Sequence, residues 1–187
     1  MQSCGAIILA AGGSSRLGEP KQLLVFQGET LLARMVRVAL ESKADPVVVI
    51  TGAHSEKCAL AITGQPVRVI HNPEWQEGIA SSIRAGVASL SGEVEALVIL
   101  LCDQPAVSAS LINALLTSKK DIAACEYGET KGPPTYFKKA FFNELLSLQG
   151  DKGAKALLAK HAGSVEAIPF PEGEWDVDLP DDLNRLQ

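Results

Sequence analysis

Short apolar runs recur along the chain and alternate with segments that have the periodicity of amphipathic helices. Most of these runs are rich in β-branched residues, as strands are. They cover residues 5–11, 46–51, 67–70, 95–101, 121–125, 134–137 and 165–170. Because the runs are continuously apolar rather than alternating, each predicted strand is expected to be covered on both faces. The pattern therefore predicts an α/β fold with a parallel or mostly parallel sheet and helices on both sides of it.

Helical periodicity fills the intervals between the predicted strands. Residues 30–42 gather apolar side chains on one helical face, and Thr30 can cap the N-terminus of that helix. Further helices are expected within residues 82–90, 108–118 and 138–148. The chain shows no linker, internal repeat or low-complexity segment, so the sequence predicts a single domain over residues 1–187.

The composition excludes several classes of function. Of the 187 residues, 47% are hydrophobic and 21% are charged, and the formal net charge is −5, so the basic face that binds nucleic acid is not expected. No apolar segment reaches the roughly 20 residues of a membrane span, and the start of the chain lacks the features of a signal peptide. We therefore expect a cytoplasmic protein with no nucleic-acid or membrane partner. The four cysteines lack C-x-x-C spacing and are expected to be reduced, mostly buried thiols.

The first predicted strand ends in a loop that is rich in glycine, polar and positively charged. Its sequence, AAGGSSRLGEPK, contains Gly12, Gly13 and Gly18, which allow the backbone to approach a ligand closely. Free N–H groups in such a loop can converge on phosphate oxygens, while Arg16 and Lys21 can supply the opposite charge. Since ligands of such sheets bind at the carboxyl ends of the strands, the loop predicts a site for a triphosphate. The alternative is an ordinary glycine-rich turn with solvated cations.

Aspartates supply the candidate metal ligands. Asp103, in the sequence LLCDQP, follows the fourth predicted strand, where a carboxylate either faces a ligand or caps the next helix. Ser108 is the better placed cap, which favours magnesium binding as the role of Asp103. Near the C-terminus, the stretch EWDVDLPDDL is also typical of the start of a short helix. Asp178 in this stretch would complete a two-carboxylate magnesium site with Asp103.

A third segment, NPEWQEGIASSIRAGV, follows the third predicted strand. Gly78, Ser81 and Ser82 open the next helix, so their small side chains and backbone groups can read a base edge or face a phosphate. Simple helix capping is the alternative for these three residues. Arg84 is interpreted as a solvated helix residue.

These motifs resemble those of a known family. LAAGGSSRLGEPKQLL is similar to the L-A-A-G-x-S-x-R-x-G-x-x-K signature of nucleotidyltransferases that use a nucleoside triphosphate. GIASSIRAG, CDQP, GPPTYF, GDKGAKALL and DVDLPDDL follow in the expected order over nearly the whole chain, and within the superfamily they most resemble the molybdenum cofactor cytidylyltransferase type, a MobA-like NTP transferase. The resemblance implies a three-layer α/β/α sandwich with a Rossmann-like, mostly parallel sheet of the nucleotide-diphospho-sugar transferase type.

The resemblance also implies roles for positions that bind the nucleotide. The residues that would line the nucleotide and its phosphates are Leu9, Ala10, Ala11, Gly12 and Gly13. Arg16 would hold the β- and γ-phosphates, and Lys21 would neutralise the α-phosphate as charge develops there. The base would be read with the help of Gly78 and Ser82.

The metal and acceptor positions follow from the same resemblance. Magnesium would be held by Asp103 and Asp178. Asp151, Gly132 and Pro134 would lie toward the acceptor. Family members often carry G-H-P or G-N-P where this chain has GPP, and this departure leaves the identity of the acceptor open.

The implied function is an enzyme that transfers CMP from CTP to molybdopterin, with magnesium as cofactor and pyrophosphate as the second product. A molybdoenzyme or its chaperone is a further expected partner. The alternatives are a guanylyl-transferring relative, a sugar- or polyol-phosphate cytidylyltransferase, and a non-catalytic nucleotide-binding accessory protein. Short motifs do not decide between cytosine and guanine, because that choice depends on the shape of the pocket.

Overall fold

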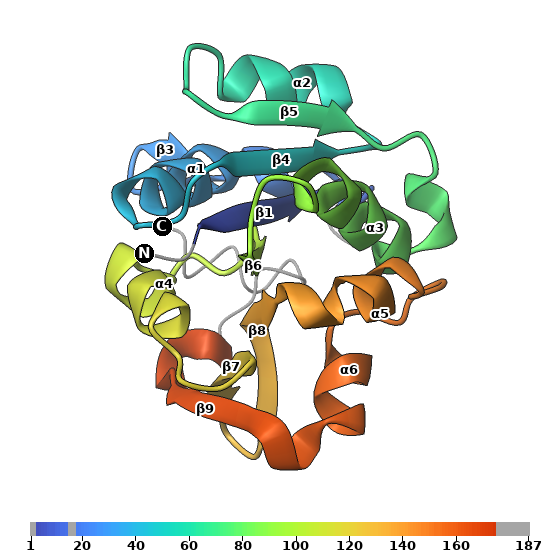
Figure 1. The fold of residues 1–187 in the computed structure, drawn as a ribbon. Coiled ribbons are helices and arrows are strands. Elements are labelled where there is room, and N and C mark those ends of the chain that lie inside the picture. Colours follow the sequence, from blue (N-terminus) through green and yellow to red (C-terminus); the bar gives the residue numbers. More distant parts are fainter. Residues whose placement is uncertain (1–2, 15–17, 175–187) are drawn as a thin grey trace.

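The computed structural model describes residues 3–14 and 18–174, in which a mostly parallel, seven-stranded sheet lies between layers of helices (Figure 1). The strands of this sheet are β1 (Cys4–Ala10), β4 (Val47–Thr51), β5 (Arg68–His71), β6 (Ala96–Leu101), β7 (Ile122–Tyr127), β8 (Thr130–Lys138) and β9 (Val165–Pro169). Each apolar run of the sequence forms one of these strands. A separate hairpin joins β2 (Val25–Phe26) to β3 (Glu29–Thr30).

The strand order is β5-β4-β1-β6-β8-β7-β9. All neighbours are parallel except that β8 runs antiparallel to both β6 and β7. The prediction of a mostly parallel sheet is therefore confirmed. The chain moves outward from β1 through β4 to β5, and then returns to place β6 on the other side of β1. Such a reversal opens a crevice between the carboxyl ends of the two central strands, where open α/β sheets bind ligands.

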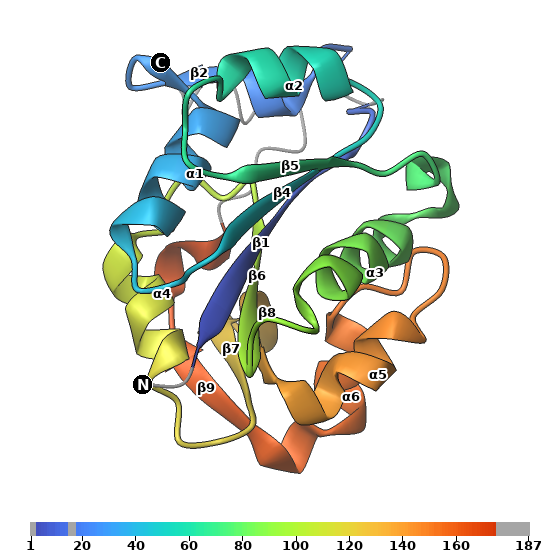
Figure 2. The same cartoon turned by 45° about the horizontal axis from the view of Figure 1, so that its top comes forward.

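Helices cover both faces of the sheet. They are α1 (Leu31–Glu41), α2 (Ser55–Ala61), α3 (Ile79–Leu90), α4 (Ala109–Leu116), α5 (Phe142–Leu146) and α6 (Lys155–Lys160). Figure 2 shows α1 and α4 on one side of the twisted sheet and α3, α5 and α6 on the other. The predicted caps are confirmed, because the Thr30 and Ser108 side chains accept hydrogen bonds from backbone N–H groups in the first turns of α1 and α4. The short helices α2 and α6 were not expected from the periodicity.

Each central strand contributes to both halves of the core. Along β1, Ile8 packs in the cluster beneath α1 and α4, whereas Ile7 packs in the cluster beneath α3, and both are 0% exposed. This double burial explains the continuously apolar runs. Gly86 lets α3 approach β1 closely, since a Cβ there would lie 2.5 Å from Ile7 Cγ2. The middle of α3 therefore packs directly against β1.

Two further expectations concern the cysteines and the membrane. All four cysteines are buried and unbridged, as expected. Burial raises the pKa of the Cys58 thiol to about 11, so this group stays protonated at neutral pH. None of the helices within the described ranges has both the length and the apolar character needed to cross a membrane.

Candidate functional site

A pocket of about 360 Å³ opens at the carboxyl ends of β1 and β6. Most of the residues expected to bind the nucleotide line it together: Leu9, Ala10, Ala11, Gly12, Gly13, Lys21, Gly78 and Ser82. Asp103, the expected metal ligand, lines it as well. Asp151, which was expected near the acceptor, lines the same pocket. The loop after β1, the loop after β6 and the start of α3 therefore converge on one cavity, although they lie far apart in the sequence.

The loop after β1 is fixed by a backbone hydrogen bond and by packing against an aromatic ring. Ala11 O accepts a hydrogen bond from the Ala53 N–H at 3.1 Å. The indole of Trp75 lies beside Gly13, where a Cβ would come within 3.3 Å of the ring. Trp75 lines the pocket but was given no role from the sequence, because an aromatic residue in a polar loop carries no motif of its own.

Lys21 and Asp103 form an ion pair inside the pocket. Lys21 Nζ donates a hydrogen bond to Asp103 Oδ2, and the two side chains are 20% and 11% exposed. Asp103 does not cap α4, since Ser108 does so, as the sequence predicts. The Arg34 Nε donates to Pro105 O at 2.8 Å, which fixes the loop that carries Asp103. A cation and a carboxylate thus meet where a phosphate chain would lie.

The second carboxylate oxygen of Asp103 indicates what else this site could hold. Asp103 Oδ1 is buried and has no hydrogen-bond partner among the residues that the structure describes. Buried polar atoms are normally paired, and carboxylate oxygens are preferred ligands of magnesium and related hard cations. The residues present therefore fit a divalent cation that is held through one carboxylate and completed by phosphate oxygens and water. Within the described ranges, no group of three or more acidic, cysteine or histidine residues forms a cage for a metal.

Two of the expected charged residues cannot be placed. Arg16, expected on the β- and γ-phosphates, and Asp178, expected as the second magnesium ligand, lie outside the described residues. Their roles stay predictions.

The start of α3 forms the third side of the pocket. Asn72 is buried, and its Nδ2 donates to Ser81 Oγ at 2.8 Å and to Ser82 Oγ at 3.0 Å. The Ser81 hydroxyl then donates to Gly78 O at 2.9 Å, so it serves the start of the helix. Ser82 instead lines the cavity, with its orientation set by Asn72. Sequence reasoning missed Asn72, whose signal was its position two residues after the predicted strand 67–70 and directly after β5.

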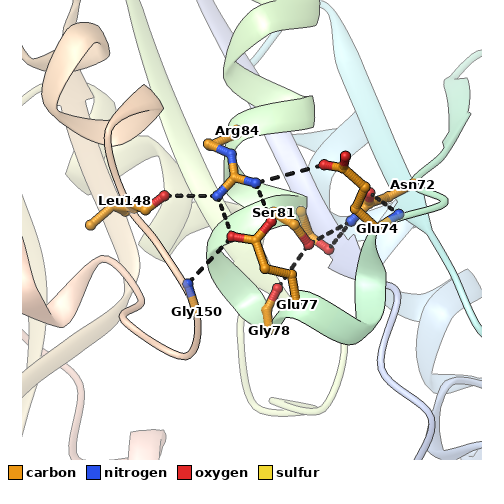
Figure 3. Close-up of polar contacts among 9 residues, drawn as sticks. Asn72, Glu74, Glu77, Gly78, Ser81, Arg84, Leu148 and Gly150 are labelled. Atoms are coloured by element: carbon orange, nitrogen blue, oxygen red, sulfur yellow. Dashed lines mark hydrogen bonds and ion pairs between the residues drawn. The ribbon is translucent and has the colours of Figure 1, made fainter.

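Arg84 is not the solvated helix residue that the sequence suggested. Its guanidinium makes a two-pronged contact with the Glu77 carboxylate at 2.8 and 2.5 Å and also donates to Leu148 O at 2.8 Å (Figure 3). Hydrogen bonding to Arg84 holds the pKa of Glu77 below its usual value. The Ala80 N–H donates to Gly150 O at 3.0 Å beside this contact. These bonds fasten the loop before Asp151 to the first turn of α3.

The remaining acceptor candidates lie at the same edge but on another strand. Because β8 is antiparallel, its first residues, including Gly132 and Pro134, lie near the carboxyl end of β6. The lining of the pocket, among the described residues, contains neither of them. Gln104 connects the loop after β6 to this part of β8, because its Nε2 donates to Pro133 O at 3.2 Å.

Fold and site together define an α/β protein with a pocket at the switch point of its sheet, where proteins of this class bind their ligands. Residues 6–165 match the family model described as the MobA-like NTP transferase domain. The chain belongs to this family and is a nucleotidyltransferase. The resemblance inferred from the motifs, and the three-layer fold that it implied, are thereby confirmed.

Several curated proteins are similar over most of their length. The purine catabolism protein PucB of Bacillus subtilis is 31% identical over 91% of this chain and 93% of its own. Nicotine blue oxidoreductase of Paenarthrobacter nicotinovorans is 30% identical over 96% and 94%. The molybdenum cofactor cytidylyltransferase of Escherichia coli is 26% identical over 98% and 95%. The names of these relatives indicate different activities. The comparisons therefore show the family of this chain but not its substrate.

Solved structures share the whole fold. A homologue of Mycobacterium tuberculosis Rv0371c from Mycobacterium sp. strain JC1 has a TM-score of 0.85 and 29% identity, over 98% of this chain and 94% of that one. Rv0371c from M. tuberculosis H37Rv, solved in complex with manganese, has a TM-score of 0.83 and 26% identity, over 100% and 98%.

Proposed function

We propose that this protein is a magnesium-dependent cytidylyltransferase that transfers CMP from CTP to molybdopterin and releases pyrophosphate. The observation that carries the proposal is the pairing of Lys21 with Asp103 beside a glycine loop, where one buried carboxylate oxygen has no partner among the residues that the structure describes. The phosphates of a nucleoside triphosphate would bind to Lys21, and a divalent cation would bind to the second carboxylate oxygen of Asp103. The cytidylyltransferase of E. coli, similar over nearly its whole length, supports the choice of base and acceptor.

The chemistry needs alignment and positive charge rather than an activated side chain. An oxygen of the acceptor phosphate attacks the α-phosphorus of CTP and forms a new P–O bond. The bond from the α-phosphorus to the bridging oxygen breaks, and pyrophosphate leaves with that electron pair. Lys21 would neutralise charge on the α-phosphate, and Arg16 would do so on the leaving group. Leu9, Ala10 and the loop that follows would hold the nucleotide in line for attack.

Magnesium would be held by Asp103 and Asp178. When bound, it supplies charge neutralisation across the phosphates and fixes their geometry. Asp103 is suited to this task because one oxygen faces Lys21 while the other has no protein partner among the described residues.

The base and the acceptor would enter from the side of α3. Gly78 and Ser82 would read the base, with the Ser82 hydroxyl fixed by Asn72. Asp151 would face the acceptor from the loop that Arg84 fastens to α3, and Gly132 and Pro134 would lie beyond it at the start of β8.

Pyrophosphate release tests the proposal directly. Purified protein with magnesium is given CTP or GTP, each with molybdopterin, with a panel of sugar and polyol phosphates, or with no acceptor. Release that requires CTP and molybdopterin is the expected result. Release with GTP, or with another acceptor, would reassign the substrate while keeping the reaction. Triphosphate binding without release under any condition would instead indicate a nucleotide-binding accessory protein.

A further inference from the structure

Gln22 is a buried polar side chain to which neither the motifs nor the proposed chemistry assigns a role. It lies in the 3-10 turn Lys21–Leu23 and is 1% exposed. Its Nε2 donates to Ala10 O at 3.1 Å and to Gly12 O at 2.7 Å. A side-chain amide has two N–H donors, and here both are directed at the backbone of the loop after β1.

These bonds decide which way the peptide groups of the loop face. Ala11 O, between the two carbonyls that Gln22 holds, accepts from the Ala53 N–H. In a planar trans peptide, the N–H of the next residue points opposite to the carbonyl. The N–H groups of Gly12 and Gly13 are therefore directed away from these donors, and neither has a hydrogen-bond partner within the described ranges. Both glycines line the pocket, so these N–H groups are available to a phosphate.

Gln22 also links the loop to the charged part of the site. Ser14 Oγ donates to Gln22 Oε1 at 3.4 Å and accepts from the backbone N–H of Lys21 at 2.9 Å. Ser14 has a φ of 51°, a conformation that residues other than glycine rarely adopt and that surrounding contacts must maintain. The loop and the backbone of the lysine that pairs with Asp103 thus form one connected unit.

We propose that Gln22 is a positioning residue that shapes this loop for the β- and γ-phosphates of the nucleotide. It acts through the carbonyls of Ala10 and Gly12, because fixing them presents the loop N–H groups to the phosphates. The inference rests on the proposed function in one respect, since it needs a nucleoside triphosphate to be the ligand of the pocket. Loss of Gln22 should then weaken binding of a triphosphate more than binding of the corresponding monophosphate.

The test is the ratio of CTP to CMP affinity, measured by calorimetry in magnesium buffer. Gln22→Met keeps the length of the side chain but removes both donors. We expect its CTP affinity to fall about tenfold and its CMP affinity to change by less than about twofold. Gln65→Met, the same change in an exposed turn, is the matched control and should leave the ratio unchanged. Because both affinities are measured on the same protein, the ratio of CTP to CMP affinity does not depend on the fraction of that protein that is folded.

Equal losses for CTP and CMP, or an unchanged ratio, in Gln22→Met would overturn the inference. If that variant does not fold, Ser14→Ala decides, because it removes the hydroxyl that joins Gln22 to Lys21 from a position that is only half-buried. The expected result is a loss of about threefold in the same ratio, and no loss would overturn the inference. If the proposed function itself is wrong, the result is different, because the wild-type protein then shows no preference for CTP over CMP.

Discussion

The two edges of the sheet carry oppositely charged residues in very different arrangements. At the amino edge, Arg68 pairs with Glu93 through two hydrogen bonds of 2.8 and 3.0 Å, and their side chains are 43% and 52% exposed. At the carboxyl edge, Lys21 and Asp103 are mostly buried, and one carboxylate oxygen lacks a partner among the described residues. The first pair is exposed to water, whereas the second lines the pocket of the candidate site.

The difference in burial separates charged pairs that act only on each other from those that can act on a ligand. An exposed ion pair gains little, because water screens both partners. Charges held in a cavity cost more to bury and are retained where they act on a ligand. We therefore expect substitutions at the carboxyl edge to change activity and those at the amino edge to change very little.

The largest effect is expected for Asp103→Asn, which keeps the shape of the side chain and removes its charge. Pyrophosphate release should fall about 10²–10³-fold in kcat, as for other groups that stabilise developing charge. Asp121→Asn, which alters the exposed pair with Lys138 at the amino edge, is the matched control and should keep wild-type kcat. Similar losses of kcat in the two variants would show that the carboxyl and amino edges do not differ in their effect on activity.

A steric change at the carboxyl edge should come next. A Cβ on Gly52 would lie 2.6 Å from Ala11 O and 2.7 Å from Trp75 Cβ, so Gly52→Ala must displace the loop after β1. We expect a loss of about 1–3 kcal/mol in the free energy of unfolding and a higher KM for the triphosphate. Denaturant titration measures the first effect and initial rates measure the second. Gly92→Ala, where a Cβ meets nothing within 4 Å, should show neither effect.

The contact between Arg84 and Glu77 should have a smaller effect that depends on pH. Because Arg84 lowers the pKa of Glu77 below its usual 4.5, this contact adds stability above pH 4.5 that is lost as the pH falls through the lowered pKa. Arg84→Met should therefore lower Tm at neutral pH, and its difference from wild type should shrink below pH 4.5. Thermal melts between pH 7 and pH 3 check this, and a constant difference would contradict the assigned cause.

The smallest effect is expected for Arg68→Gln at the amino edge. Its pair with Glu93 is exposed on both sides, so kcat and KM should equal those of the wild type and Tm should move by less than about 2 °C. Added salt should reduce even that shift. A loss of activity in this variant would show that the amino edge also matters to the site.

The sequence predicted the features that depend on local pattern. The strands, the caps at Thr30 and Ser108, and the loop and carboxylate that follow β1 and β6 all come from neighbouring residues. The reversed direction of β8 does not, because its apolar run resembles those of the parallel strands. The tight turn at Gly128, whose φ is 54°, joins β7 directly to β8, but it lies between the apolar runs 121–125 and 134–137 and was therefore not recognised from them.

The supporting residues of the site could not be predicted for a related reason. Gln22 acts on carbonyls ten and twelve positions away, and Arg84 bonds to Leu148, 64 positions along the chain. Asn72 orients the Ser82 hydroxyl from the end of another strand. Such contacts exist only after the sheet has brought these segments together, so no short motif contains them.

Metal binding at the carboxyl edge tests whether Asp103 is a metal ligand. Wild-type protein and Asp103→Asn are titrated with Mn²⁺ in the presence of CTP, and free Mn²⁺ is followed by electron paramagnetic resonance. We expect the wild type to bind Mn²⁺ with CTP and the variant to bind it at least about tenfold more weakly. Equal binding by the two proteins would show that Asp103 does not bind the metal of a metal–nucleotide ligand.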